Sequence, residues 1–385
     1  MVDNHTAAVD IESHGDDHPP ATSTASVTVV CACYNHERTI AQALDSFLGQ
    51  KANFSFCVLV GDDASTDGSA AIITDYANRF PEIIIPVLRD ENIGGGRNWE
   101  DLISRCDSRY IAFCDGDDYW TDEGKLQMQF DLMESDESLR ACFHDALIVD
   151  ETVGGRWFQL ESFSHTKDGL PRWPSGNRYF VKKRRYHVRN FIPFGFIHTS
   201  SMFVRWNYSV GFPPWIFGHG FGDYPLWAIQ VGIGDIGFID RTMSVYRRTG
   251  NTLFDFSSRS AYWLESKRGG IAIDDGLIGH FSSVCPDRRI VAALRRRKAD
   301  DLAKLIAGSL DNEEPNDTRA LIEEYRDDIE SCFGVAVPDA LDGDAFASFM
   351  RKLVRKAPIP PYRQSKIGYF RALKNKARKL LTIAS

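Results

Sequence analysis

The feature that most constrains this chain is a regular alternation of short apolar runs and helix-like segments across residues 26 to 150. Apolar runs rich in Val, Ile, Cys and Phe occupy residues 26–35, 56–65, 83–90, 109–115 and 140–150. Segments with apolar residues at helical spacing lie between them, at residues 37–50, 69–80, 94–106 and 125–135. This alternation predicts an α/β fold: a doubly wound, mostly parallel sheet flanked by helices.

The alternation ends in the middle of the chain. Residues 151–190 are rich in Gly, Pro, aromatic and basic residues, and so long a segment between regular elements is typical of a functional loop. Regular patterns return with a strand at 196–205, a short helix that begins at Asp223 and a strand at 236–248. The remainder of the chain reads as helices.

These patterns divide the chain into parts with different expected roles. We expect a disordered leader, an α/β domain in two halves, a helical extension and a basic amphipathic tail. In that order they cover residues 1–25, 26–255 (halves 26–125 and 126–255), 256–350 and 351–385. Pro86 interrupts the third strand, which places that strand at an edge of the sheet or at a bulge.

Composition excludes several classes of protein. The eight cysteines are scattered without a CxxC pair, which predicts reduced thiols in a cytosolic protein. Cys31 and Cys33 lie two apart in the first strand and should point to the same face. No apolar run approaches the roughly 20 residues that span a bilayer, and residues 1–25 lack the basic start and apolar centre of a signal peptide.

Three carboxylates crowd the end of the fourth strand, in the sequence CDGDDYW. Asp115, Asp117 and Asp118 repel one another and resist the loss of water together. We therefore expect a divalent cation to balance them. An oxygen-only site of this kind suits Mg²⁺ or Mn²⁺.

Polar segments also follow the second and third strands. Asp62 and Asp63 end the second strand, and residues 91–97 follow the third. In doubly wound sheets, ligands bind beyond the carboxyl ends of the strands, where the topology switches. These groups and the three carboxylates of the fourth strand should therefore converge on one crevice.

Five motifs stand in order along the chain at predicted strand ends and helix starts. They are VTVVCACYN, VGDDASTDG, ENIGGGRN, CDGDDYW, and GDYPLW with the later SVYRR. Together they resemble the family 2 inverting glycosyltransferases of bacterial polysaccharide type, which have the GT-A fold and use nucleotide-sugar donors. The resemblance covers roughly residues 26 to 250 and implies a GT-A domain with a nucleotide-binding half at 26–125 and an acceptor half at 126–255. It implies metal-dependent transfer of a sugar from a nucleoside-diphosphate donor, with UDP or dTDP favoured, to a hydroxyl.

The resemblance assigns the acidic turn to the metal and the diphosphate. Asp117 is implied as a metal ligand, Asp115 as a neighbour of the ribose and the metal, and Asp118 as a residue that orients them. A metal ion on the diphosphate neutralises the charge that develops as the sugar–diphosphate bond breaks. Gly116 lets the backbone approach the ligand closely.

The nucleotide base is implied to lie against the first two strand ends. Asp63 corresponds to a carboxylate that accepts the N3–H of uracil or thymine, and Asp62 helps to shape the pocket. Ala32 and Tyr34, at the end of the first apolar run, are expected near the base. A core aromatic is an equally good interpretation of Tyr34.

The ENIGGGRN loop is expected to face the phosphates. Asn92 and Gly94 lie in a glycine turn at a helix start, where free N–H groups favour anions. Arg97 is a candidate for a fixed cation on the diphosphate, and a surface arginine is the alternative. Just before this region, Ser65 and Asp67 are predicted to cap the second helix.

The resemblance places the catalytic base at Asp223. Inverting transfer is a single displacement, so a group must take the proton of the acceptor hydroxyl, and in the family this is a carboxylate at a helix start. A helix cap is the alternative interpretation of Asp223, and both can hold together. His198, Thr199 and Ser200 correspond to an acceptor-side segment, or form only a polar strand end.

One position departs from the family pattern. Many relatives carry a histidine near the diphosphate or metal shortly after the last strand, where this chain has Thr249 in YRRTG. Threonine is a poorer ligand, so either Arg247 or Arg248 contacts the phosphate or the metal is held more loosely. His144 and Asp145 are expected to border the donor sugar.

The tail is strongly basic. Residues 351–385 hold eleven Lys or Arg and no Asp or Glu, whereas the preceding residues hold 34 basic against 53 acidic residues. Residues 365–381 combine an apolar helical face with a basic one, typical of a helix on an anionic membrane surface. A helix docked on the acidic body of the protein is the alternative, and nucleic-acid binding is not expected. We therefore expect a peripheral protein at the inner face of the cytoplasmic membrane, with a glycan or polyprenyl-linked acceptor.

Two other functional classes compete with this interpretation. Sugar nucleotidyltransferases share a similar sheet but need a GxGTR-type loop after the first strand, where this chain has CACYNHERT. A catalytically silent glycan- or membrane-binding module that retains the fold is the alternative from a different class. The Thr249 departure favours it, and the intact Asp117 and Asp223 argue against it.

Overall fold

The structure is a computed structural model. It describes residues 25–150, 158–160, 184–191, 197–206, 213, 215–217, 223–232, 234–248, 261–284, 287–309, 315–341 and 343–356. The predicted leader, most of the predicted 151–190 loop, Thr249 and the tail beyond residue 356 lie outside these residues.

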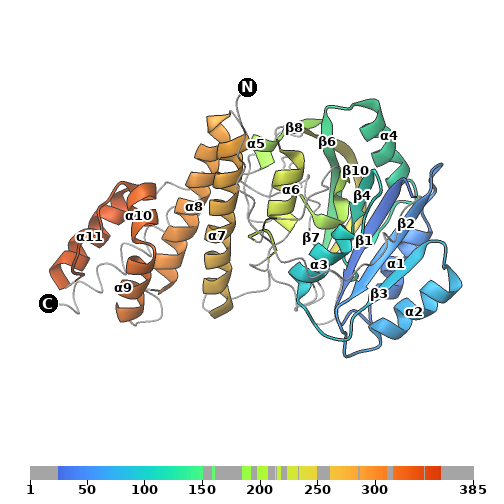
Figure 1. Cartoon of the computed structure of the whole chain (residues 1–385), viewed down its shortest axis with the longest axis horizontal. Coiled ribbons are helices and arrows are strands. Elements are labelled where there is room, and N and C mark those ends of the chain that lie inside the picture. The colour runs from blue at the N-terminus through green and yellow to red at the C-terminus, as the bar shows by residue number, and fades with distance from the viewer. Residues whose placement is uncertain are drawn as a thin grey trace, which may run out of the picture.

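The strands of the described residues join in one mixed sheet (Figure 1). They are β1 (Val27–Cys33), β2 (Phe56–Asp62), β3 (Ile84–Leu88), β4 (Tyr110–Phe113), β5 (Tyr119–Trp120), β6 (Leu139–Asp150), β7 (Phe158–Leu160), β8 (Arg185–His187), β9 (Phe203–Arg205) and β10 (Asp235–Arg248). The main order is β3-β2-β1-β4-β9-β6-β10-β5, and β7 and β8 pair with β6 and β10. Strands β1 to β4 run parallel, as do β6 and β10, whereas β9 is antiparallel to both of its neighbours. The predicted α/β fold is confirmed, and β3, which contains Pro86, lies at an edge as expected.

The helices cover both faces of this sheet and continue beyond it. They are α1 (Ile40–Leu48), α2 (Ser69–Arg79), α3 (Gly95–Ser104), α4 (Lys125–Ser135), α5 (Val188–Phe191), the 3₁₀ helix η1 (Thr199–Ser201), α6 (Asp223–Val231), α7 (Ala261–Val284), α8 (Arg288–Ser309), α9 (Pro315–Glu324), α10 (Arg326–Phe333) and α11 (Gly343–Lys356). Helices α1, α2 and α4 pack on one face, and α3 and α6 on the other. None of the helices in the described residues is long and apolar enough to cross a membrane.

The alternation of side chains along β1 explains the two layers. Val29, Cys31 and Cys33 point into the core under α1 and α2, and Val30 points into the core under α3 and α6. The expected shared face of the two cysteines is therefore confirmed. All cysteines in the described residues are free thiols.

One predicted strand is mostly wrong. Of residues 196–205, only the last three form a strand, β9, and Thr199–Ser201 form the 3₁₀ helix η1. The N–H of Ser201 donates to the carbonyl of His198 at 2.9 Å, and its hydroxyl donates to the same carbonyl at 2.7 Å. Polar side chains that bond the nearby backbone in this way compete with a strand ladder.

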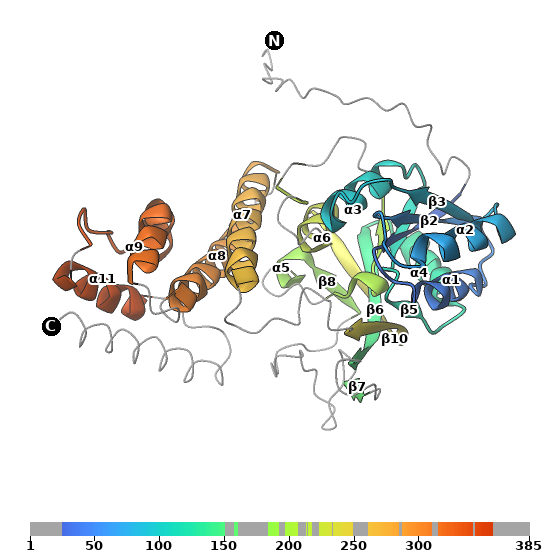
Figure 2. The ribbon, with the colours of Figure 1, turned by 90° about the horizontal axis from the view of Figure 1, so that it is seen from below.

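The helical extension is not a separate body. Ile273 and Leu277 of α7 and Leu294 of α8 belong to the same hydrophobic core as Leu226 of α6. A third core, the distal core, lies further along, where α8 packs against α9, α10 and α11 (Figures 1 and 2). Helices α7 and α8 therefore join the sheet to the distal helices.

Candidate active site

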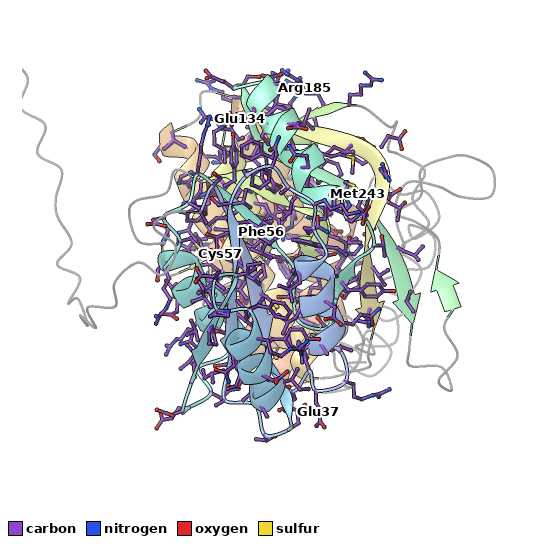
Figure 3. The ribbon with its side chains drawn as sticks, turned by 90° about the vertical axis from the view of Figure 1, so that its right-hand side faces the viewer. Glu37, Phe56, Cys57, Glu134, Arg185 and Met243 are labelled. Atoms are coloured by element: carbon purple, nitrogen blue, oxygen red, sulfur yellow. The ribbon has the colours of Figure 1, made fainter. Side chains whose placement is uncertain are left out.

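The carboxyl ends of the parallel strands meet at one edge of the sheet. Residue Val27 of β1 lies opposite Phe56 of β2 and Tyr110 of β4, so all three strands run in the same direction. In Figure 3, Glu37, just beyond β1, lies at one end of the view, and Glu134 and Arg185 lie at the other. The predicted site residues belong to the end marked by Glu37.

Backbone bonds join these strand ends directly. The N–H of Gly116 donates to the carbonyl of Ala32 at 2.8 Å, and the N–H of Asp63 donates to the carbonyl of Cys33 at 2.9 Å. A Cβ on Gly116 would lie 2.9 Å from both His36 and Ile40. The glycine between the two carboxylates is thus required by close packing against the segment that follows β1.

Asp63 organises the loop after β3. Its carboxylate is buried and accepts the N–H groups of Ile93 and Gly94, each at 2.9 Å, and the amide of Asn92 donates to its carbonyl at 2.9 Å. Gly94 has φ of +87°, a conformation that favours glycine. The second strand end and the ENIGGGRN loop therefore meet, as the sequence predicted. Recognition of the base by Asp63 stays a prediction.

In the turn between β2 and α2, only one of the two predicted helix caps is found. The carboxylate of Asp67 accepts the N–H of Ser69, the first residue of α2, at 3.0 Å, as expected. Ser65 instead donates its hydroxyl to Asp62 at 2.6 Å and accepts the N–H of Asn35 at 2.9 Å. The predicted capping role of Ser65 is wrong because Asp62 and Asn35 engage its hydroxyl.

The acidic turn after β4 holds its carboxylates in different surroundings. The indole N–H of Trp99 donates to Asp115 at 3.1 Å, and loss of water, with repulsion from Asp117, raises the pKa of Asp115 to about 8. Asp118 is buried and accepts the backbone N–H of Arg247 at 2.9 Å. Burial and then Asp117 raise the pKa of Asp118. Asp117 is partly exposed and remains accessible.

Arg247 lies beside this turn. Its guanidinium donates to the carbonyl of Asp117 at 2.6 Å and to Gln42, and lies 4.5 Å over the ring of Tyr119. The side chain is buried. Of the two arginines expected near the phosphate, Arg247 supports the acidic turn from within, and the side chain of Arg248 lies outside the described residues.

Asp223 is the first residue of α6, as predicted. Its carboxylate accepts the hydroxyl of Thr199 at 3.2 Å and the N–H of Tyr224 at 2.6 Å. Loss of water raises the pKa of Asp223 despite these bonds. Asp223 also contributes to the raised pKa of Asp115, so the two carboxylates share one electrostatic environment.

The other acceptor-side residues lie in distinct positions. The ring of His198 stacks on Tyr246 with 4.7 Å between centres. Ser200 is fully buried, and its hydroxyl donates to Ser244 at 3.1 Å, so it faces the interior. His144 is buried with Nδ1 2.8 Å from the carbonyl of Asp145, and burial lowers its pKa.

Two predicted ligand contacts lie at the surface. The side chain of Tyr34 is 46% exposed, which excludes the core interpretation and leaves its ring accessible. Arg97, near the start of α3, is exposed as well. Both positions are compatible with a ligand at this edge.

The residues at the edge suit a divalent cation. Asp115 and Asp117 offer carboxylate oxygens, the ligand type that Mg²⁺ and Mn²⁺ prefer. No group of three or more His, Cys, Asp or Glu side chains in the described residues is arranged to hold a metal alone. A cation here would therefore need phosphate and water oxygens to complete its shell.

Several supporting residues escaped the sequence analysis. Trp99 of α3 and Arg247 of β10 contact the acidic turn, and Gln42 of α1 accepts a hydrogen bond from the guanidinium of Arg247. The only local signal was the tryptophan that follows the glycine loop. The other two contacts join residues more than 70 positions apart, which no local pattern reveals.

The fold is shared with solved structures of other proteins. The crystal structure of S. aureus TarS 1–349 in complex with UDP matches with a TM-score of 0.53 and 15% identity, over 92% of this chain and 91% of that one. The fold and the acidic sheet edge thus place the chain in the GT-A class. A model of the family described as Glycosyl transferase family 2 matches residues 28–205. The part of the chain that this model covers therefore belongs to glycosyl transferase family 2.

Sequence relatives include an uncharacterized protein of Mycobacterium tuberculosis and the amylovoran biosynthesis glycosyltransferase AmsE of Erwinia amylovora. The first is 31% identical over 248 residues, 64% of this chain and 66% of that protein. The second is 28% identical over 152 residues, 39% of this chain and 51% of that protein. The chain therefore spans slightly less than two thirds of the mycobacterial relative and about half of AmsE.

Proposed function

We propose that this chain transfers a sugar from a nucleoside-diphosphate sugar to a hydroxyl, with inversion, at the carboxyl edge of its sheet. The observation that carries the proposal is that Asp223, at a helix start, lies within electrostatic range of Asp115, one of the two candidate metal ligands. A base and a diphosphate site must lie this close, because the acceptor attacks the carbon that bears the leaving diphosphate.

The chemistry is a single displacement. The acceptor oxygen forms a bond to the anomeric carbon while the bond from that carbon to the diphosphate oxygen breaks, and the electron pair leaves with the nucleoside diphosphate. Asp223 takes the acceptor proton, and its raised pKa makes it a stronger base than an exposed aspartate. Thr199 and the N–H of Tyr224 hold the carboxylate in place. Asp115 and Asp117 would hold a Mg²⁺ or Mn²⁺ ion, which would supply positive charge for the leaving diphosphate.

The donor nucleotide is best supported as UDP or dTDP. Asp63 accepts the N3–H of the base with lone pairs beyond those used by Ile93 and Gly94. Tyr34 offers an exposed ring for the base, and Arg97 a cation for the diphosphate. The UDP complex of the structural neighbour TarS supports UDP.

The acceptor is proposed to be a growing surface polysaccharide or a lipid-linked oligosaccharide. The name of the relative AmsE, an amylovoran biosynthesis glycosyltransferase, supports polysaccharide synthesis. The acceptor side is formed by His198 and Thr199, whereas the buried Ser200 supports η1 from within. With the acceptor bound at His198 and Thr199, its hydroxyls would lie on the side of Asp223 that faces away from the nucleotide.

Nucleotide-sugar screening tests the proposal. A thermal-shift screen of UDP- and dTDP-sugars with Mn²⁺ or Mg²⁺ should identify a donor that raises the melting temperature. Asp117→Asn and Asp223→Asn should each abolish turnover of that donor, and only Asp117→Asn should weaken metal-dependent nucleotide binding. Asp75→Asn, an exposed carboxylate on α2 paired with Arg79, is the matched control and should be unaffected. Full turnover by Asp223→Asn would remove the base assignment.

The same experiment separates the enzyme from a silent binding module. A silent module would bind a nucleotide sugar or a glycan without releasing nucleoside diphosphate under any metal condition. The raised pKa of Asp223 at the start of α6 favours the enzyme, because a binding module needs no base there.

We further propose that residues 351–385 hold the protein on an anionic membrane surface at the cytoplasmic side. Within this tail the structure describes only the end of α11, whose Phe349 and Leu353 pack into the distal core. Its Arg351 and Lys352 are exposed, so this segment is docked and presents cations outward. Co-sedimentation with anionic vesicles, with and without residues 357–385, tests the proposal, and equal binding by both proteins would contradict it.

A further inference from the structure

A charged group from the helical extension lies against the start of α6. The guanidinium of Arg297, on α8, lies 3.8 Å from the ring centre of Tyr224. Asp274 of α7 is 0% exposed and lies 3.3 Å from Arg297. Tyr224 follows Asp223 directly, and its backbone N–H donates to the carboxylate of Asp223. Helix α8, outside the family-matched residues, therefore contacts the ring of the residue whose backbone holds the candidate base, and α7 pairs with the contacting guanidinium.

The contact is embedded in a continuous core. Leu226 of α6, Ile273 and Leu277 of α7 and Leu294 of α8 belong to one core, and Figure 1 shows α6 beside α7, with α8 on the other side of α7. Because protein interiors are close-packed, the first turn of α6 cannot shift without displacing these helices. The contact between Arg297 and Tyr224 therefore adds to core packing that already holds the first turn of α6 in place.

The chemistry of the pair explains why arginine stands here. A buried carboxylate such as Asp274 needs a countercharge, and the planar guanidinium can meet it while stacking on an aromatic ring. Four groups bear on Asp223: Arg297 from α8, Asp115 from the end of β4, the hydroxyl of Thr199 and the N–H of Tyr224. Among these, Arg297 is the cation.

We propose that Arg297, anchored by Asp274, is a positioning residue for sugar transfer, because it fixes Tyr224 and thereby the orientation of Asp223. This inference rests on the proposed role of Asp223 as the base. It gives the helical extension a part in the reaction in addition to its part in stability.

The test compares two neighbouring cations of α8. Arg297→Met should lower the kcat for turnover of the UDP-sugar by about 10- to 100-fold, the scale of a small misplacement of a catalytic group. Binding of UDP with Mn²⁺ should be unchanged, because Asp63 and Asp117 are not touched. Lys298→Met is the matched control: Lys298 is the next residue of α8, it is buried more deeply than Arg297, and it pairs with Asp275 at 2.5 Å and with Asp328. Lys298→Met should lose stability and keep its kcat per binding site.

A double-mutant cycle separates positioning from a structural effect. UDP-binding stoichiometry by calorimetry corrects kcat for the active fraction of each protein. In a Tyr224→Leu background, Arg297→Met should cause no further loss, because its effect passes through the ring. Multiplicative losses, or an equal loss of corrected kcat in Lys298→Met, would overturn the inference.

A second variant covers the case in which Arg297→Met does not fold. Arg297→Gln combined with Asp274→Asn removes both charges together, so no unpaired buried charge remains. It should show the same loss of kcat with unchanged UDP binding, and full kcat would overturn the inference. Asp223→Asn separates the two levels: full turnover in that variant would overturn the proposed function together with this inference. Loss of turnover there with full kcat in Arg297→Gln/Asp274→Asn would overturn the inference alone.

Discussion

Replacement of Lys125 by Met is expected to change how the stability of this protein depends on pH. Lys125 is the first residue of α4 and is 0% exposed. Its ammonium donates to Gln129 at 2.7 Å and lies 3.8 Å from the ring centre of Trp120. Burial disfavours the charged form and lowers the pKa of Lys125 from its ordinary value of 10.5 to about 7. The positive end of the helix dipole disfavours a cation at this position as well.

The sign and size of the effect follow from proton linkage. Between about pH 7 and pH 10.5, the unfolded chain keeps a proton on this lysine that the folded chain has released. The free energy of unfolding therefore rises with pH across that window. One pH unit contributes at most about 1.4 kcal/mol, so between about pH 7.5 and about pH 9.5 the lysine should add roughly 2–3 kcal/mol. Lys125→Met lacks this contribution, and the other titrating groups act in both proteins.

Urea denaturation at the two pH values measures the effect. The wild-type protein should gain roughly 2–3 kcal/mol more than Lys125→Met on going to the higher pH. Lys51→Met is the control, because Lys51 is largely exposed and pairs with Glu123 at 2.6 Å, so its pH dependence should match the wild type. Parallel pH profiles for the wild type and Lys125→Met would refute the reasoning, because they would mean that Lys125 stays charged in the folded protein.

Three further predictions concern the edge of the sheet. Gly96→Ala places a Cβ 2.5 Å from the backbone oxygen of Phe217, whereas Gly95→Ala meets nothing within 4 Å; only the first should lose stability, by about 1–3 kcal/mol in thermal denaturation, and equal losses would contradict the packing. Turnover should fall as the pH falls through the raised pKa of Asp223, because only the carboxylate accepts a proton; a pH–rate profile with its acid limb near pH 4, the ordinary range of aspartate, would contradict this. Tyr34→Ala should weaken nucleotide binding in calorimetry and leave the melting temperature nearly unchanged, since the ring is exposed; a large loss of stability would show that Tyr34 is structural.

Local patterns were sufficient for the sheet and for the acidic residues. The period of apolar residues predicted β1 to β4 with their helices, and parallel strands necessarily bring their carboxyl ends to one edge. For that reason Asp63, Asp115 and the ENIGGGRN loop could be placed together before any coordinates were known. The prediction for residues 196–205 failed because the hydroxyl of Ser201 bonds the nearby carbonyl of His198, and apolar periodicity does not register such local bonds.

The supporting residues could not be predicted in the same way. Trp99 donates to Asp115, Arg247 to the acidic turn, and Arg297 contacts Tyr224 from another part of the chain. Each contact depends on where distant elements pack, and an isolated arginine or tryptophan in a sequence is compatible with many positions. Lys125 is the clearest case, because a lysine at the start of a predicted helix is ordinarily exposed, whereas here it is fully buried.

The burial of charged groups near the acidic turn explains why this edge of the sheet needs helices on both faces. Burial raises the pKa of both Asp115 and Asp118 and lowers that of Lys125, so the interior around the turn disfavours charge of either sign. A site that binds a cation and a diphosphate in such surroundings must be held in place by packing of the neighbouring helices. Helices α1, α2 and α4 supply it on one face, and α3 and α6 with α7 and α8 supply it on the other. The helical extension therefore belongs to the packing that holds buried carboxylates at the strand ends. Its removal should affect both the site and the fold.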